Sequence, residues 1–487
     1  MAKPPDVTLS KGALDGERYL ASLKDEREVW LDGERVDVTS HPAFAGMLRE
    51  LRRLYDQQWE PASRDIMTYV SPETGQRVSY SYLLPKSAED LQLKRRNTEH
   101  WAKETWGQLP RIPDFMANVV VGLYDLRDQL AAVDPRFGEN VVRYHRYCEE
   151  HDLALTHSIV DPQIDRSKTP LDDPDLALRV VEETRTGIVV RGAKQLATFA
   201  PFAHELVVYL SASYVQRGRP DFVAWFAVPM ATPGLKILCR EPFSLHASRH
   251  SHPFARQCDE QDSMVFFDDM HVPWDRVFLL YDAVAAARGL RSINAWSLYS
   301  GQIRFHQRIL AFVAVATMLA EAVGVDEFRN IRELLGELIS YAEMIRYGLR
   351  GMESDAYRTA GGLWAPGNDL AMSSIAAQFA PRLLEIIREI GASGLIMQPS
   401  EADLRHPALK PLLTRYMRGK NLAVAEKSRL FRLAWDLVGD SYASRQDLYE
   451  RWHRGDISRN RANLYMSFDR KALVARLRDV IRGPLEH

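Results

Sequence analysis

The sequence predicts a mostly helical α+β protein with a helical N-terminal part, a small antiparallel sheet or barrel in the middle, and a C-terminal helical bundle. Apolar residues recur at helical spacing through residues 88–134 and again beyond residue 282. Between residues 187 and 280, short β-branched runs alternate with turns. No long helical segment separates those runs, which argues against parallel βαβ units. We therefore expect three domains: 1–150, 151–281, and 282–487 with its tail.

In the N-terminal part, residues 29–36 have a strand-like pattern, and helices are expected at 45–57 and within 88–134. In the C-terminal part, apolar residues from Phe328 to Leu349 form one stripe of a long helix. Further helices are expected near 368–390 and 410–438. Long amphipathic helices with few breaks are typical of an antiparallel bundle.

The composition is that of an ordinary globular protein. Of 487 residues, 46% are apolar and 26% are charged, which excludes wholesale disorder. The formal charge of −2 gives no global electrostatic reason to bind nucleic acid or an anionic membrane. Three scattered cysteines do not make a disulfide scaffold. The first residues lack an apolar signal segment, and the apolar run 309–320 is too short to span a bilayer, so we expect a cytoplasmic protein.

Two nucleotide-binding patterns are absent from the sequence. No GxGxxG motif opens a helix after a strand, and no GxxxxGK[ST] motif occurs. A redox enzyme built on this chain would therefore obtain its reducing equivalents from elsewhere.

Four segments contain candidate functional residues. Pro110 and Pro113 bracket Arg111 and predict a rigid loop that presents a fixed guanidinium, although spacing alone favours an arginine that pairs with Asp114 or solvent. Residues 155–167 place His157 ahead of amide, carboxylate and guanidinium groups. The turn 438–445 has small residues that would let a ligand approach the backbone, but the residues alone favour a plain connection between helices.

The fourth segment contains three histidines at positions 246, 250 and 252. Histidine pairs that bind metals usually need a helix to align them and a carboxylate at fixed spacing. Pro253 and the neighbouring serines indicate a loop instead, so we expect no metal there.

Together, these stretches resemble the oxygenase component of the two-component 4-hydroxyphenylacetate 3-monooxygenase family, nearly end to end. The matching segments are YLASLKDEREVWLDGERV (19–36), DVTSHPAF (37–44), SPETGQRVSYSYLLP (71–85), RIPDF (111–115), DLALTHSIVDPQIDRS (152–167), GIVVRGAKQLATFAP (187–201), FFDDMHVPWDRVF (266–278), GLIMQPSEADL (394–404) and RQDLYER (445–451). The resemblance implies an acyl-CoA dehydrogenase-like fold with a central antiparallel β-barrel, assembled as a homotetramer or homodimer. It also implies that a separate NAD(P)H:flavin reductase supplies FADH2, and that the flavin reacts with molecular oxygen. The resulting flavin hydroperoxide would hydroxylate a phenol ortho to its hydroxyl group.

The same resemblance assigns roles to individual residues. Arg111 and His157 are the expected catalytic groups. The residues expected to contact the phenol are Arg111, Phe115, His157, Ser211 and Ala212. Those expected to contact FAD, some of them from a neighbouring subunit, are Gln163, Ile164, Asp165, Arg166, Thr198, Tyr442, Ala443, Ser444 and Arg445.

The chain departs from the family pattern at Phe115, where 4-hydroxyphenylacetate enzymes often have a tyrosine that binds the substrate. The lost hydroxyl leaves the substrate open between a 4-hydroxyphenylacetate-like phenol and a tyrosine-derived one, free or bound to a carrier protein. Two alternatives of other kinds are an acyl-CoA dehydrogenase-like flavoenzyme and a non-catalytic flavin-binding homologue. The 4-hydroxybutyryl-CoA dehydratases of the same fold are excluded because no cysteine follows Cys258 to hold their iron–sulfur cluster.

Overall fold

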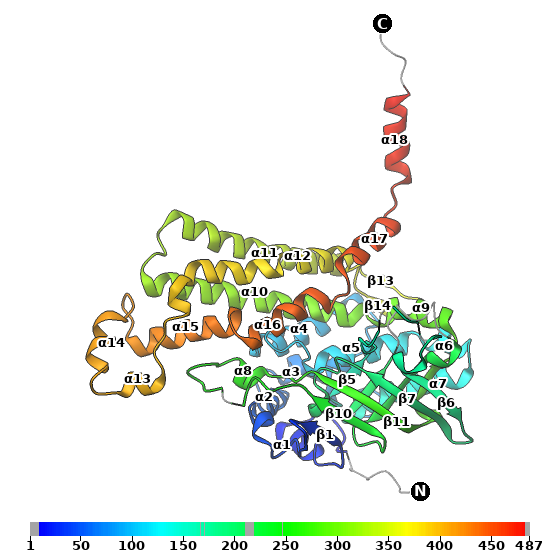
Figure 1. The fold of residues 1–487 in the computed structure, drawn as a ribbon. Helices are drawn as coiled ribbons and strands as arrows, with labels where there is room; N and C mark the ends of the chain where they lie inside the picture. Colours follow the sequence, from blue (N-terminus) through cyan, green and yellow to red (C-terminus); the bar gives the residue numbers. More distant parts are fainter. Residues whose placement is uncertain (1–8, 166, 170, 210–218, 246, 483–487) are drawn as a thin grey trace.

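The computed structural model describes residues 9–165, 167–169, 171–209, 219–245 and 247–482. Its elements follow the predicted order of helices, strands and helices (Figure 1). The N-terminal helices are α1 (Gly16–Ser22), α2 (Ala45–Asp56), α3 (Arg64–Met67), α4 (Ala88–Glu104), α5 (Pro113–Asp125), α6 (Arg127–Ala131) and α7 (Pro135–His151). A hairpin of β3 (Thr68–Val70) and β4 (Arg77–Ser79) lies between α3 and α4.

Local sequence signals define the ends of these helices. Ser87 and Asp90 form a capping box at the start of α4, which satisfies backbone N–H groups that have no partner within the helix. Asp134 caps α7 through the N–H of Arg136, and Pro135 occupies its first position. The helix ends at Asp152, whose backbone is left-handed with φ 48°.

The strands form two main sheets. The larger contains β2 (Glu34–Arg35), β1 (Glu28–Leu31), β10 (Leu235–Cys239), β11 (Ser263–Pro273), β7 (Gly187–Lys194) and β6 (Arg179–Glu183), in that order. The smaller contains β12 (Val277–Leu280), β9 (Ala224–Pro229), β8 (Glu205–Val208) and β5 (Leu155–Ser158). Neither sheet closes on itself within the described residues, so the central barrel is not confirmed.

The prediction of a purely antiparallel centre was wrong at two pairings. Strand β1 pairs parallel with β10, and β5 pairs parallel with β8. In both pairs the earlier strand enters from the helical N-terminal part, so it joins the sheet without a hairpin turn and is free to run parallel. The period-2 pattern within each strand contains no information about this direction.

The C-terminal part is a helical bundle. It contains α9 (Ala283–Ile293), α10 (Ala295–Val323), α11 (Arg329–Ser354), α12 (Leu370–Gly391), α15 (Val424–Val438) and α16 (Ser441–Trp452). The helix expected over 410–438 is broken into α14 (Lys410–Tyr416) and α15, because Asn421 adopts a left-handed backbone with φ 59°. A short helix, α13 (Glu401–Arg405), and the pair β13 (Tyr357–Arg358) and β14 (Trp364–Ala365) lie in the connections.

Two large apolar cores hold these parts together. The first joins the N-terminal helices to both sheets and includes Trp101, Trp225 and Phe267. The second lies within the bundle, between α10, α11, α12 and α15. Beyond α16, the helix α17 (Ile457–Ser467) packs against α12, and α18 (Lys471–Ile481) leads away from the bundle (Figure 1).

Two helical stretches are long and apolar enough to cross a membrane, Ala283–Val323 and Leu370–Leu395. In the most apolar windows of these stretches, 61% and 56% of the residues are buried inside the protein. Both contribute to the core of the bundle. We therefore interpret them as core helices, in agreement with the interpretation of 309–320.

Candidate active site

The loop between α4 and α5 holds Arg111 in place, as the flanking prolines predict. Gly107 has φ +64°, and a Cβ atom added there would lie 2.4 Å from the backbone nitrogen of Arg308, so the loop lies directly against α10. The backbone N–H of Arg111 donates to Glu260 Oε2 at 2.9 Å. Both ends of the loop are therefore fixed before the side chain makes any contact.

The guanidinium of Arg111 joins residues that are far apart in the sequence. Its Nη1 donates to the Tyr449 hydroxyl at 2.9 Å, and its Nη2 lies 3.2 Å from His157 Nε2. The guanidinium carbon lies 4.1 Å from the ring centre of Phe115, close enough for a cation–π contact. Arg111, Phe115 and His157 thus form one buried cluster.

Asp114 fixes the start of α5, beside this cluster. Its buried carboxylate accepts hydrogen bonds from the side chains of Asn97, Thr98, Asn118 and Ser300, at 2.6–2.9 Å. These donors come from α4, α5 and α10, so one carboxylate ties three helices together. It does not pair with Arg111, which removes the alternative reading of that arginine as a simple partner of Asp114.

His157 lies on β5, whose four residues are all buried. Its Nδ1 is 2.9 Å from the hydroxyl of Tyr209, and its ring meets the Phe115 ring edge-on with centres 6.0 Å apart. Burial, and then the charge of Arg111, hold the pKa of His157 well below its ordinary value. The imidazole is therefore neutral.

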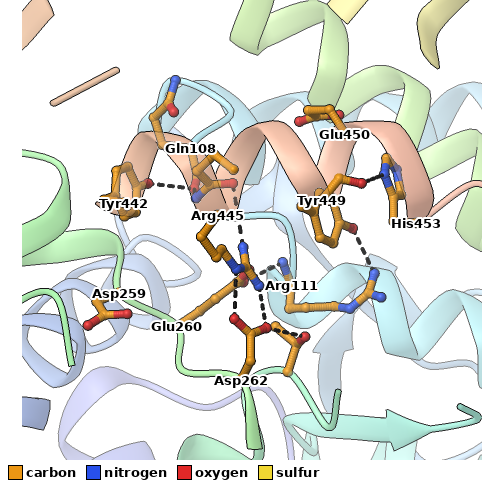
Figure 2. A network of polar contacts seen from close by, with 12 residues as sticks. Gln108, Arg111, Asp259, Glu260, Asp262, Tyr442, Arg445, Tyr449, Glu450 and His453 are labelled. Carbon is orange, nitrogen blue, oxygen red and sulfur yellow. Dashed lines mark hydrogen bonds and ion pairs between the residues drawn. The ribbon is translucent and has the colours of Figure 1, made fainter. Parts of the chain in front are cut away.

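A second polar cluster adjoins Arg111 (Figure 2). Arg445 makes a bidentate contact with Asp262, at 2.8 and 2.6 Å, and an ion pair with Glu260 at 2.7 Å. Burial alone would raise the pKa of Asp262, but the positive charges of Arg445 and Arg240 hold it below its ordinary value. Thr198 donates to the same carboxylate at 2.7 Å. The structure therefore brings Thr198 and Arg445 to the same carboxylate.

The segment 442–445 is the first turn of α16 rather than a turn between helices. Asp440 caps this helix by accepting from the N–H of Ala443 at 3.0 Å, a signal visible in the sequence. Tyr442 is buried, and its hydroxyl donates to the backbone oxygen of Gln108 at 3.1 Å (Figure 2). Ser444 is exposed and lines an open pocket of about 680 Å³, whose wall comprises Phe243, Trp435, Gly439, Asp440, Ser441, Ser444, Arg445 and Leu448.

The remaining cofactor candidates lie after β5. Gln163 and Ile164 are exposed, with Ile164 at 59%, and Asp165 is half-buried. Arg166, Ser211 and Ala212 lie outside the described residues. The residues described from this segment therefore present side chains to the surface rather than to the core.

Tyr449 and Glu450 were missed by the sequence reasoning. Glu450 receives a bidentate contact from Arg304, lies 3.2 Å from Arg454 and 3.6 Å from Arg308, and all four side chains are buried. Tyr449 and His453 stack one helical turn apart. The resemblance placed the segment 445–451 in the family, but no local pattern distinguishes a buried glutamate from an exposed one on a helix.

The three histidines of the loop 244–252 do not converge among the described residues. His250 is buried, and its Nε2 lies 3.5 Å from the Pro399 oxygen. His252 has its Nε2 3.6 Å from Asp440. His246 lies outside the described residues. No group of three or more histidine, cysteine, aspartate or glutamate side chains that could hold a metal ion occurs within the described ranges.

Comparisons with known proteins cover nearly the whole chain. Residues 15–279 match the family model for the 4-hydroxyphenylacetate 3-hydroxylase N terminal region, and residues 290–482 match the model for its C terminal region. The 4-hydroxyphenylacetate 3-monooxygenase oxygenase component of Thermus thermophilus is 36% identical over 482 residues, which cover 97% of this chain and 98% of that protein.

Two further comparisons bear on ligands. A crystal structure of the oxygenase component HpaB of 4-hydroxyphenylacetate 3-monooxygenase, complexed with FAD and 4-hydroxyphenylacetate, superimposes with a TM-score of 0.92. It is 35% identical and covers 96% of this chain and 98% of its own. A Streptomyces globisporus monooxygenase of a (3S)-3-amino-3-(3-chloro-4-hydroxyphenyl)propanoyl group on a peptidyl-carrier protein is 30% identical, covering 96% of this chain and 89% of that protein.

Proposed function

The chain belongs to the 4-hydroxyphenylacetate 3-hydroxylase family, and from this premise we propose that it is an FADH2-dependent monooxygenase. It hydroxylates a phenol ortho to the hydroxyl group, with molecular oxygen as co-substrate and reduced flavin supplied by a separate reductase. The observation that carries the proposal is the buried cluster of Arg111, Phe115 and His157. The alternatives are an acyl-CoA dehydrogenase-like flavoenzyme and a non-catalytic homologue. Neither is favoured, because the similar proteins are named as oxygenase components of monooxygenases.

The residues around this cluster fit a flavin. Arg111 Nε is buried and has no hydrogen-bond partner among the described residues, so it is available to a ligand. Ile164 and Leu196 expose 59% and 55% of their surface, apolar area that a flat ring system would cover. Thr198 donates to Asp262, which pairs with Arg445 on the wall of the pocket beside Ser444, so polar groups lie next to this pocket.

We assign holding roles to Gln163, Ile164, Asp165, Thr198 and Ser444. Arg445 is already paired with two carboxylates, so its role is to orient Asp262, and through it Thr198, rather than to meet a phosphate directly. When bound, reduced FAD activates molecular oxygen and supplies the oxygen atom that is transferred to the ring.

The side chains of the cluster have separate tasks. Arg111 is a donor that never deprotonates, and its contacts with Tyr449 and the Glu260 carboxylate hold it in one position. His157 is neutral and can take the phenol proton, which raises the electron density of the ring at its ortho carbons. Phe115 covers one side and helps to exclude water from the site.

The substrate, assembly and location are part of the same proposal. Phe115 lacks a hydroxyl, so we propose a phenol held mainly by Arg111 and His157, either 4-hydroxyphenylacetate-like or tyrosine-derived. The protruding helix α18 exposes Leu477, Val480 and Ile481 by 66–81%, which supports assembly into a homotetramer or homodimer. We also propose that the chain divides into three domains, with boundaries after residues 150 and 281, and that the protein is cytoplasmic.

The experiment combines the purified chain, FAD, NADH and 4-hydroxyphenylacetate or a tyrosine-derived phenol, with and without a flavin reductase. We expect hydroxylated product only when the reductase is present, because no nicotinamide-binding motif occurs in the sequence. Product formation with NADH and the isolated chain alone would refute the dependence on a partner. Failure of every phenol in the presence of the reductase would refute the reaction.

A further inference from the structure

Two side chains behind His157, those of Tyr209 and Asn294, continue from it as a series of hydrogen bonds with one possible direction. The Tyr209 hydroxyl lies 2.9 Å from His157 Nδ1 and 3.2 Å from Asn294 Oδ1. Tyr209 and His157 are buried and Asn294 is half-buried. Tyr209 follows β8, and Asn294 lies at the junction of α9 and α10, so the chain links the smaller sheet to the bundle.

Asn294, at the far end of these hydrogen bonds, fixes which group donates and which accepts. Asn294 Nδ2 donates to the backbone oxygen of Leu290 at 3.1 Å, so the oxygen of the amide faces Tyr209. An amide oxygen can only accept, and Tyr209 must therefore donate its single hydroxyl proton to Asn294. Its oxygen lone pairs are then left to accept a proton from His157 Nδ1.

The contact of His157 with Arg111, on the other side of the ring, leads independently to a protonated Nδ1. Arg111 Nη2 faces His157 Nε2 at 3.2 Å, and a guanidinium nitrogen can only donate. Nε2 must therefore be the unprotonated nitrogen of the neutral ring, and Nδ1 must carry the proton. Two sets of contacts on opposite sides of the imidazole thus require the same tautomer.

We propose that Tyr209 and Asn294 are positioning residues that hold His157 with Nε2 unprotonated, so that His157 receives the proton of the bound phenol. The inference rests on the proposed function for the identity of the substrate. When the phenol binds, Arg111 Nη2 turns its N–H from Nε2 to the phenol oxygen, which frees the one lone pair of Nε2. The phenol O–H bond then breaks, its proton joins Nε2, and the products are a phenolate held by Arg111 and an imidazolium. The imidazolium keeps its Nδ1 hydrogen bond to Tyr209, so no second proton has to move.

This arrangement matters because the imidazole of His157 is buried. In a buried site, an Nδ1–H group without an acceptor is costly, and the ring would otherwise rotate or exchange its proton to find one. Tyr209 supplies the acceptor only while its own proton is committed to Asn294. Asn294 therefore controls the tautomer of His157 through Tyr209, although Asn294 does not touch the imidazole in any described contact.

The test uses four variants. Tyr209→Phe removes the acceptor for Nδ1–H, and Asn294→Leu removes the acceptor for the Tyr209 proton. Asn294→Asp keeps an oxygen that accepts from Tyr209 and should behave as the wild type. Tyr19→Phe is the matched control, because the Tyr19 hydroxyl is also buried and donates to the backbone oxygen of Phe202 at 2.7 Å, outside the site.

The first readout is the tautomer itself, which does not depend on activity. Solid-state nitrogen-15 spectra of ring-labelled histidine, with the His157 signals assigned by difference from His157→Gln, distinguish protonated from unprotonated ring nitrogens. We expect an unprotonated Nε2 and a protonated Nδ1 in the wild type, Asn294→Asp and Tyr19→Phe. In Tyr209→Phe and Asn294→Leu, signal from the tautomer with Nε2 protonated should appear.

The second readout is the rate of hydroxylation with reductase present. Tyr209→Phe and Asn294→Leu should slow it about five- to thirtyfold, the range expected when one buried hydrogen bond is lost. A wild-type spectrum with Nε2 protonated would overturn the inference even if the wild type hydroxylates phenols. Wild-type tautomer and rate in both Tyr209→Phe and Asn294→Leu would overturn it as well. A wild type that hydroxylates no phenol would instead refute the proposed function, whatever the spectrum.

Discussion

Replacing Glu450 by glutamine tests how the buried charges around the site are balanced. This carboxylate lies among the guanidinium groups of Arg304, Arg308 and Arg454, and each of these side chains is at most 3% exposed. Glutamine keeps the shape of the side chain and removes only the charge. The variant therefore leaves three buried cations around a neutral amide.

The structure indicates a large effect. Removing one partner of a buried ion pair costs about 3–5 kcal/mol, because the remaining charge stays desolvated without compensation. Here the nearest distances between Glu450 and the guanidinium groups of Arg304, Arg454 and Arg308 are 2.5, 3.2 and 3.6 Å, so all three cations lose their counter-charge together. We expect Glu450→Gln to lower the free energy of unfolding by about 3–5 kcal/mol, a substantial part of a typical total of about 5–15 kcal/mol.

The assay is urea-induced unfolding followed by circular dichroism, with Glu389→Gln as the matched control. Glu389 also pairs with an arginine, Arg382, but its side chain is 49% exposed, and an exposed pair contributes about 0–1 kcal/mol. Equal urea midpoints for Glu450→Gln and Glu389→Gln would refute the reasoning.

A pH series adds an independent check on Glu450. Burial alone would raise its pKa, but the charges of Arg304 and Arg454 hold the pKa below the ordinary value. In the unfolded chain a glutamate has a pKa of about 4.3. Because the pKa of Glu450 is lower in the folded state, its ionised form stabilises the fold above that pH, and this stability is lost as the pH falls toward the pKa of the folded state. The difference between the wild type and Glu450→Gln should therefore shrink as the pH falls below about 4.

Three further predictions concern the site and its surroundings. His157→Ala should consume oxygen but release hydrogen peroxide in place of most product, whereas Arg111→Ala should lose phenol binding; equal coupling of oxygen to product in both and in the wild type would contradict these roles. Burial raises the pKa of Asp152 to about 6, so ionisation opposes folding and the stability of the protonated form is lost as the pH rises from about 4 through 6. Asp152→Asn keeps an acceptor for the Leu14 N–H and should exceed the wild type in unfolding free energy by about 1–3 kcal/mol at about pH 8 but not at about pH 4; no gain at the higher pH would contradict this. Exhaustive chelation should leave hydroxylation unchanged, since the loop 244–252 is not expected to bind a catalytic metal; loss that one metal ion restores would overturn it.

The sequence predicted the parts of the fold and site that depend on local patterns. The amphipathic stripe from Phe328 to Leu349 became α11, and the prolines around Arg111 indicated its rigid loop. The residues 155–167 indicated His157, and resemblance to a family added Phe115; the structure places both against Arg111. Local pattern and family motif together therefore led to three residues that the structure brings into contact.

The parts that the sequence did not predict depend on contacts between distant segments. Glu260 and Asp262 look like part of an acidic surface turn, and only their pairing with Arg445, almost two hundred residues later, shows that they are buried. Tyr449 has no neighbour in sequence that marks it as the partner of Arg111. The direction of β5 beside β8 is likewise invisible to a period-2 pattern.

A single turnover without any reductase tests the central claim most directly. The chain is mixed anaerobically with chemically reduced FAD and a phenol, and oxygen-18 gas is then added in the absence of NAD(P)H. We predict an ortho-hydroxylated product that contains one oxygen-18 atom, because the chain needs only reduced flavin, oxygen and the buried cluster of Arg111 and His157. Failure to bind reduced FAD, or a product whose new oxygen comes from water, would contradict the account.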